Sequence, residues 1–355
     1  MGQRIALLPA SLFLTAALLL PTGCRRSTER STTSEATPAA ETEGADSPAL
    51  TTPPVAANAT PAKPAAPRGN TPPPPAEIWK EFSGTKAMAE VEKQVAFGPR
   101  PAGSVELLGA RKAIVTSLQA SGWVAELQEF NDTTPRGSVH FVNIIARHPG
   151  VDGRPPAPTT PRAIVCSHYD TKRFSTIKFV GASDGASSTG ALVELARVLA
   201  LDPGLAAKVE LVFFDGEEAV QNFSDTDGLY GSRYYAASLG SSGRIGQFKF
   251  AILWDMIGDK DLTITLPPDS PKELAKGIFE AAETLHVRDH FSFLSRDITD
   301  DHVPLQSRRI PSIDLIDFDY FPWHTADDTL DKLSPTSLQT IGSVTLLYLT
   351  RALPK

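Results

Sequence analysis

From residue 76 onward, the apolar residues repeat with two alternating periods. Spacings of three and four residues predict helices at 78–96, 105–121, 187–200, 232–239, 271–285 and 335–351. Short apolar or β-branched runs predict strands at 139–147, 163–167, 209–214, 248–254, 262–266 and 312–316. Most of these runs are hydrophobic on both sides, so helices must cover both faces of the sheet. The pattern therefore predicts one α/β domain with a central mixed, largely parallel sheet flanked by helices.

Side chains that can bind a metal follow several of these apolar runs. They are His168, Asp184, Glu218, Asp255 and His324. In open α/β sheets the functional crevice lies outside the carboxyl ends of the strands, so these groups are expected to meet there. Carboxylates and imidazoles are the ligands of catalytic zinc, and Glu217, next to Glu218, can transfer protons beside the ion. Asp184 taken alone could equally be a helix N-cap.

The first 23 residues have the pattern of a bacterial lipoprotein signal peptide. Arg4 precedes an apolar stretch, and small residues lead to Cys24. The stretch is short for a membrane span and contains Pro9. We expect cleavage and lipidation at Cys24, with ordinary secretion as the alternative because Leu20 lies one position further from the cysteine than usual. Either way, the chain is expected to be exported to the periplasm or the cell surface.

Residues 24–75 consist mainly of Pro, Thr, Ser, Ala and Glu. Such a composition cannot bury a hydrophobic core, so we expect a disordered tether with a reach on the order of 40 Å or more. Residues 76–355 then form the catalytic domain, a length that suits one large domain better than two. We expect contact with the membrane through the lipid anchor only.

Charge and cysteine content exclude two classes of protein. The formal net charge is −7 and no basic stripe offsets it, which argues against a nucleic-acid partner. Once Cys24 is lipidated, Cys166 is the remaining cysteine, so the domain cannot be a disulfide scaffold. Cys166 lies in an apolar run and is expected in the core. We expect a monomer.

Six short motifs resemble those of the zinc-dependent glutaminyl cyclases. They are S-H-Y-D at 167–170, G-A-S-D at 181–184, F-F-D-G-E-E-A at 213–219, L-Y-G-S-R at 229–233, D-D-H-V-P at 300–304 and W-H-T at 323–325. The similarity spans essentially the whole globular domain. The cyclases share their fold with the two-zinc aminopeptidases, and several of the motifs occur in both groups.

The resemblance implies a glutaminyl-peptide cyclotransferase that acts on the N-termini of peptides and proteins. Its ligand set for one zinc ion would be Asp184, Glu218 and His324. Glu217 would be the general base and acid for closing an N-terminal glutamine to pyroglutamate with loss of ammonia. Asp255 and Asp300 would hydrogen-bond the leaving group and the acid–base residue. Trp323 would line the substrate pocket.

Two other functions stay open. In an exported aminopeptidase, the resemblance makes Asp184 a bridging carboxylate, with His168 and Asp255 completing a second zinc site. The 229–233 and 300–304 segments and the Trp323–His324 pair favour the cyclase. A chain that only binds peptide N-termini is the third possibility.

Three features depart from the cyclase pattern. Phe223 stands where a pocket tryptophan is usual, which keeps an aromatic surface but loses an N–H donor. Asp314 replaces a histidine of the active-site hydrogen-bond network, so several acids are crowded together, and they should raise at least one pKa or require a cation. The segment 314–324 is one residue shorter than expected. These changes concern efficiency and substrate preference more than metal binding.

Overall fold

The computed structural model describes residues 73–153, 157 and 159–353. The predicted signal peptide at 1–23, Cys24 and the predicted tether up to residue 72 lie outside these residues. Among the helices that are described, none is both long and apolar enough to cross a membrane.

An eight-stranded sheet with the order β1-β2-β4-β3-β5-β8-β6-β7 forms the centre of the domain. The strands are β1 (Val124–Thr134), β2 (Gly137–Arg147), β3 (Arg162–His168), β4 (Val209–Phe214), β5 (Phe248–Asp255), β6 (Ile264–Leu266), β7 (Phe291–Phe293) and β8 (Ser312–Ile316). β4, β3, β5 and β8 are parallel neighbours, whereas β1 and β2 add to β4 as antiparallel strands. The predicted mixed, largely parallel sheet is confirmed.

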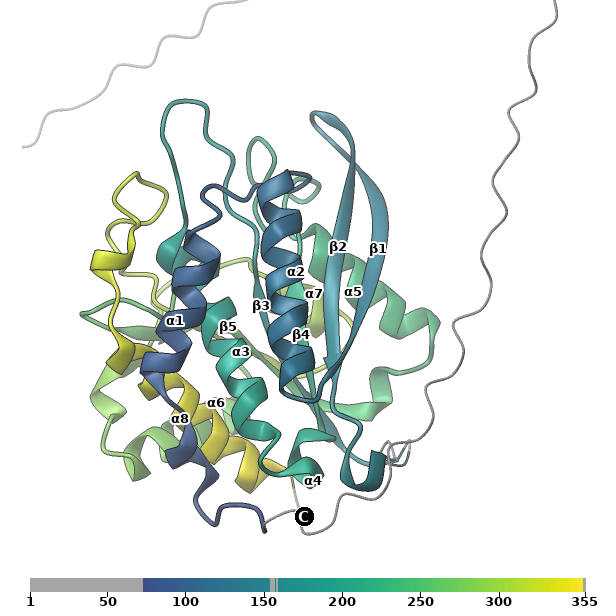
Figure 1. Ribbon diagram of the computed structural model, residues 1–355, viewed down its shortest axis with the longest axis vertical. Helices are drawn as coiled ribbons and strands as arrows, with labels where there is room; N and C mark the ends of the chain where they lie inside the picture. Colours follow the sequence, from purple (N-terminus) through teal and green to yellow (C-terminus); the bar gives the residue numbers. More distant parts are fainter. Residues whose placement is uncertain (1–72, 154–156, 158, 354–355) are drawn as a thin grey trace, which may run out of the picture. The chain divides into compact units, whose positions relative to one another are not determined.

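Helices cover both faces of this sheet, as the two-sided apolar runs require. The helices are α1 (Gly84–Val95), α2 (Val105–Ala120), α3 (Ser188–Leu199), α4 (Pro203–Ala206), α5 (Tyr230–Ser241), α6 (Lys272–Thr284), α7 (His302–Ser307) and α8 (Pro335–Ala352). In Figure 1, α1, α2, α3 and α8 lie in front of the strands. Side chains of α1, α3, α6 and α8 build the larger core, and those of α5 and α7 build a smaller core with Cys166. Cys166 is fully buried, as predicted.

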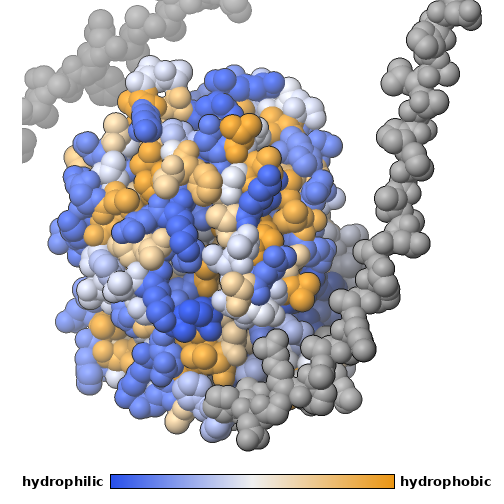
Figure 2. Space-filling model, viewed as in Figure 1, coloured by the Kyte–Doolittle hydropathy of each residue, from blue (hydrophilic) through white to orange (hydrophobic). Residues whose placement is uncertain are grey.

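The surface seen from the α1–α3 side is mainly hydrophilic, with apolar residues scattered among the polar ones (Figure 2). Single exposed apolar residues of this kind are normal for a soluble protein surface. This face therefore gives no reason to place the functional site on it.

The prediction of one helix over 78–96 is wrong. A 3-10 turn at Ile78–Glu81 ends at Phe82, whose ψ of 131° is extended, and α1 begins after Ser83. The side-chain oxygen of Ser83 caps α1 by accepting from Lys86 N. The backbone N–H of Ser83 donates to the Glu194 carboxylate at 3.0 Å. The apolar period continues across the break, so periodicity alone does not reveal it.

Two strands are missing from the prediction. β1 is an edge strand in which Phe130 and Thr134 are the buried residues, so it lacks a strong hydrophobic pattern. β7 is three residues long. The strands that carry candidate ligands are the inner ones. β3 ends at His168, β5 ends at Asp255, and Glu217 follows β4 by three residues, so the parallel strands deliver these groups to one edge of the sheet.

Candidate metal centre

Glu217 and Glu218 lie in the turn after β4, and Asp170 holds this turn in place. Asp170 is fully buried, and its two carboxylate oxygens accept from the backbone N–H groups of Glu217 and Glu218 at 3.2 and 3.3 Å. Gly216 has a φ of 74°, the left-handed conformation that lets the chain turn directly after the strand. As a result, the two adjacent glutamates are fixed by backbone contacts and do not depend on each other for position.

Asp184 lies in the kinked segment Ala182–Ser187 directly before α3, and its own ψ of 100° is not helical. Asp328, also fully buried, accepts from Ser183 N at 2.7 Å and from Asp184 N at 3.2 Å. At Gly185 the φ is 87°, and a Cβ there would lie 2.6 Å from the carbonyl oxygen of Asp170. The N-cap reading of Asp184 is wrong, because α3 begins after Ser187 and no side chain caps it.

His324 lies in the segment that follows β8 and has a φ of 56°, which is uncommon for a non-glycine residue. Its ring stacks on Trp323 with centroids 4.3 Å apart, and the rings of Phe174 and Phe179 lie in T-shaped contact with it, each with its centroid 5.7 Å away. The aromatic contacts hold the imidazole in the orientation that the strained backbone gives it.

Three of these side chains meet as a first triad, Asp184, Glu218 and His324. His324 Nε2 lies 3.0 Å from Glu218 Oε1 and 3.3 Å from Asp184 Oδ2. One ligand atom from each of the three lies within 4.8 Å of the others, which is close enough for all to bind one ion. The His324 side chain is 27% exposed, so this triad opens to solvent.

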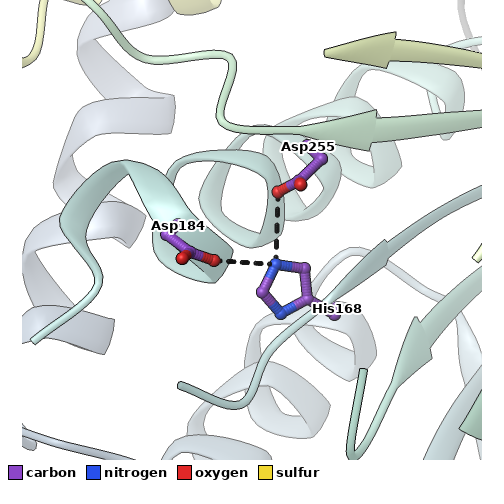
Figure 3. A group of neighbouring side chains, drawn as sticks. All are labelled: His168, Asp184 and Asp255. Carbon is purple, nitrogen blue, oxygen red and sulfur yellow. Dashed lines mark hydrogen bonds and ion pairs between the residues drawn. The ribbon is translucent and has the colours of Figure 1, made fainter. Parts of the chain in front are cut away.

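A second triad, His168, Asp184 and Asp255, shares Asp184 with the first (Figure 3). His168 Nε2 lies 3.2 Å from Asp184 Oδ1 and 3.2 Å from Asp255 Oδ1. His168 Nδ1 lies 3.6 Å from Asp170. The His168 side chain is only 1% exposed, so the second triad is closed on the histidine side.

The electrostatics of the first triad suit a bound cation. Burial raises the pKa of Glu218, and the negative charge of Asp184 raises it further. Burial also opposes ionisation of Asp184, but hydrogen bonds from His168 and His324 outweigh it and lower its pKa. Burial lowers the pKa of His324, yet its two carboxylate partners raise it to about 10. The two buried carboxylates thus require a positive charge beside them. A divalent ion with the imidazole as a ligand supplies that charge.

A cavity of about 600 Å³ opens beside the first triad, and we call it the metal pocket. Residues that line it include Asp184, Glu217, Glu218, Asp255, Trp323 and His324. Asp300 and Phe223 also line this pocket, so every predicted site residue of the globular domain lines it except His168, which contacts two of the lining residues in the second triad. Trp323 is 41% exposed and Phe223 is 47% exposed, so neither is a core aromatic.

Two acids in this pocket have raised pKa values. Burial, and then the negative charge of Glu218, raises the pKa of Glu217 well above its usual value. Burial, and then the charge of Asp255, raises the pKa of Asp300 to about 6. A carboxyl group whose pKa lies near the working pH can both accept and return a proton. Glu217 is half-buried beside the triad and therefore has the environment of an acid–base group.

Sequence reasoning missed Asp170 and Asp328, which hold the turns that carry Glu217, Glu218 and Asp184. Both lie inside or close to motifs: Asp170 ends S-H-Y-D, and Asp328 follows His324 by four residues. An acidic residue two positions after a candidate histidine ligand was the available signal. Because hydrogen-bond partners far apart in the sequence cannot be derived from spacing, that signal does not reveal what the acid holds.

Comparison with known proteins gives the family. The model of peptidase family M28 matches residues 143–349, more than half of the chain. The glutaminyl-peptide cyclotransferase of Bos taurus is 31% identical over 291 residues, which cover 69% of this chain and 76% of that protein. The crystal structure of an Acidobacteriales bacterium glutaminyl cyclase aligns with a TM-score of 0.69 at 33% identity, covering 81% of this chain and 98% of that one.

A crystal structure of a Zn-dependent exopeptidase from Parabacteroides distasonis is also similar. It aligns with a TM-score of 0.67 at 26% identity and covers 75% of this chain and 98% of that one. The fold is thus common to cyclases and exopeptidases, while the Bos taurus relative at 31% identity is a cyclotransferase. The chain therefore belongs to peptidase family M28 and, within it, to the glutaminyl-peptide cyclotransferases.

Proposed function

We propose that this protein is a glutaminyl-peptide cyclotransferase that converts the N-terminal glutamine of peptides to pyroglutamate and releases ammonia. The observation that carries the proposal is the open first triad with the half-buried Glu217 beside it. Two carboxylates and one imidazole within 4.8 Å fit a zinc ion that keeps a position open for substrate. When bound there, zinc supplies Lewis-acid polarisation of the γ-carbonyl of the glutamine.

The reaction needs no water. The α-nitrogen forms a bond to the γ-carbon of the same residue, and the bond from the γ-carbon to the amide nitrogen breaks. One proton leaves the α-amine and one proton reaches the departing nitrogen, so a single group that accepts and then returns a proton balances the reaction. We assign this role to Glu217, because its raised pKa lets it hold the proton between the two steps.

Asp255 and Asp300 line the same pocket. Their role is to hydrogen-bond the leaving group and the acid–base residue and so to orient both. Asp255 receives a hydrogen bond from His168 on one side, which fixes its carboxylate toward the pocket. Trp323 and Phe223 supply apolar walls that hold the glutamine side chain folded back on its own amine. A ring closure gains much from such confinement, because effective molarities in well-oriented intramolecular reactions are high.

The second triad supports one alternative. His168, Asp184 and Asp255 also meet within 4.8 Å, so a second ion at that place would give the two-metal centre of an aminopeptidase. The burial of His168 disfavours this reading. Its side chain is 1% exposed and its Nε2 lies 3.2 Å from both carboxylates, so the histidine side of this triad offers no open coordination position to a substrate, whereas His324 in the first triad is 27% exposed.

The test uses the full chain with two substrates. We expect a glutaminyl peptide to release ammonia and give pyroglutamyl product, and a leucyl amide to release no leucine. Chelation should abolish ammonia release, and added zinc should restore it. Release of leucine with about two zinc ions bound per chain would instead establish the aminopeptidase.

We propose that one zinc ion binds in the catalytic domain, at the first triad. We also propose that the chain is exported and lipidated at Cys24, with residues 24–75 as a tether. The support is the lipoprotein-like pattern before Cys24 and the scarcity of large apolar residues in the segment 24–75. Labelling with a radioactive fatty acid checks this: wild type should be labelled and Cys24→Ser should not. Equal labelling of the two would disprove lipidation at this cysteine.

A further inference from the structure

A second cavity of about 540 Å³ adjoins the metal pocket, and we call it the arginine groove. Its lining includes Phe223, Leu229, Arg233, Thr299, Pro304 and Arg308. Phe223 and Thr299 also line the metal pocket, so the two cavities meet at these residues. The groove is therefore a continuation of the site, and a substrate longer than one residue can extend into it.

Phe223, at the junction, is held rigidly although it is 47% exposed. The carboxylate of Asp227 accepts from the backbone N–H groups of Val220, Gln221 and Asn222 at 2.7, 2.9 and 3.0 Å, and so fixes the loop that carries the ring. Gly228 leaves room for the ring, because a Cβ there would lie 2.8 Å from it. An exposed aromatic on a fixed loop is a preorganised contact surface for a ligand.

Two guanidinium groups give the groove a positive charge. Arg233 lies over the Tyr230 ring at 4.9 Å and donates to the carbonyl oxygen of Asp225 at 2.6 Å, so its position is fixed. Arg308 is exposed at the end of α7. Among the described residues, neither arginine has a carboxylate within 4.0 Å. With Asp225 as the opposing acid in the lining, the groove is net positive in a chain of net charge −7.

The chemistry of ring closure determines which way the peptide leaves the metal pocket. The γ-amide of the glutamine is at the first triad and its α-amine is at Glu217, so the rest of the peptide starts on the Glu217 side. The carbonyl oxygen of Glu217 accepts from Leu229 N at 2.8 Å, and Leu229 lines the arginine groove. A smaller cavity of about 230 Å³, which includes Arg173, instead opens beside Glu218, a metal ligand.

We propose that the arginine groove binds the peptide residues that follow the N-terminal glutamine, and that it selects substrates with acidic side chains at these positions. This inference rests on the proposed cyclotransferase function. Phe223 contacts the backbone and side chain next to the glutamine, and Arg233 and Arg308 pair with carboxylates further along the peptide. The preferred substrates are thus proteins and peptides that begin with glutamine followed by an acidic segment.

The experiment compares kcat/KM for Gln-Ala-Glu-Glu, Gln-Ala-Gln-Gln and Gln-Ala-Lys-Lys, each divided by the value for glutaminamide, which has no following residue. We expect the acidic peptide to exceed the neutral one by about tenfold, since two partly exposed charge pairs each contribute a few-fold. The advantage should appear in KM and shrink in 0.5 M salt. In the Arg233→Gln/Arg308→Gln double variant, the acidic-to-neutral ratio should fall below about twofold.

Arg173→Gln is the matched control, because it removes an arginine from the other cavity beside the site. The acidic-to-neutral ratio should stay at the wild-type value in this variant. A ratio that survives in the double variant, or that is lost in Arg173→Gln, overturns the proposal. The single variant Arg308→Gln, at an exposed position, repeats the test if the double variant fails to fold. Turnover of glutaminamide reports on the cyclotransferase itself, so loss of the proposed function would be seen separately.

Discussion

The two ligand triads share Asp184 and differ in their access to solvent. In the first, His324 is 27% exposed and faces a pocket of about 600 Å³. In the second, His168 is 1% exposed and lies between Asp184 and Asp255 at 3.2 Å from each. A catalytic metal needs a free coordination position, which the first triad offers. The comparison teaches that ligand type and spacing alone do not decide metal number, because two triads of the same ligand types differ in solvent access.

The strongest test of this difference compares one carboxylate from each triad. Glu218→Gln and Asp255→Asn both replace an acid by an amide of the same shape. Glu218→Gln should lose the metal and lower kcat/KM by at least about 10⁴-fold, because transition-state charge stabilisation disappears. Asp255→Asn should retain one ion and lose far less activity. Metal analysis of dialysed protein with steady-state kinetics checks both, and a loss of one ion out of two in Asp255→Asn would contradict the single-metal reading.

Glu217→Gln separates proton transfer from metal binding. Glu217 adjoins a ligand of the first triad but is not one of the three. We expect full zinc content and a kcat lower by about 10³-fold, the size of a general acid–base contribution. Zinc content by mass spectrometry and ammonia release by a coupled assay give the two values. Equal loss of zinc in Glu217→Gln and Glu218→Gln would show that the two roles are assigned wrongly.

Removal of the ion should change the pH dependence of stability. Burial, and then the charge of Asp184, raises the pKa of Asp328 to about 6, and the pKa of His324 is raised to about 10. Both folded-state values lie above the unfolded ones. Asp328 thus makes its full contribution to the free energy of unfolding below about pH 4 and loses it as pH rises through 6. His324 loses its contribution between about pH 6.5 and 10.

We therefore expect these two groups to lower the unfolding free energy of the metal-free protein by about 4 kcal/mol between pH 5 and 8.5. Zinc requires a neutral His324, so the gain on adding zinc should increase with pH over the same range. Urea unfolding at several pH values, with and without zinc, measures this. His324→Gln is the control and should show no zinc gain. A zinc gain that decreases toward high pH would mean that His324 is not a ligand.

The sequence predicts the inner part of the molecule better than its edges. The runs at 163–167, 209–214 and 248–254 are apolar on both sides, and the observed strands end within one residue of them. β1 escapes prediction because an edge strand exposes most of its side chains. At the helix break, Ser83 N donates to Glu194, more than a hundred residues away, a contact that the apolar spacing around Ser83 does not show.

In the site, too, features set by the local sequence could be predicted, and features set by distant contacts could not. The five candidate ligands could be found because each follows a strand or a small-residue loop, and the parallel sheet brings their positions together. The roles of Asp170 and Asp328 could not, because each acts by accepting backbone N–H groups from a distant segment. Likewise, the burial of His168 depends on how Asp184 and Asp255 pack around its Nε2, which the residue types alone do not specify.

Asp314 provides the finest test, because it lies on β8 close to the second triad. Burial, followed by the negative charges of Asp300 and Asp255, raises its pKa well above the usual value and so favours the protonated form. Asp314→Asn keeps the shape of the side chain and imitates that form. We therefore expect kcat/KM within about threefold of wild type and a stability change below about 1 kcal/mol.

If Asp314 were ionised, its charge would add to those of Asp255 and Asp300, and His302 Nδ1, 3.7 Å from Asp314 Oδ2, would be a buried partner for it. A buried cluster of this kind is stable only if cations offset its charge, and a metal ion in the second triad would supply part of that charge. Asp314→Asn would in that case weaken binding of a second ion and lower kcat/KM by tenfold or more. A pH–rate profile that is the same for wild type and variant between pH 6 and 8.5 would instead show that the charge of Asp314 takes no part in catalysis.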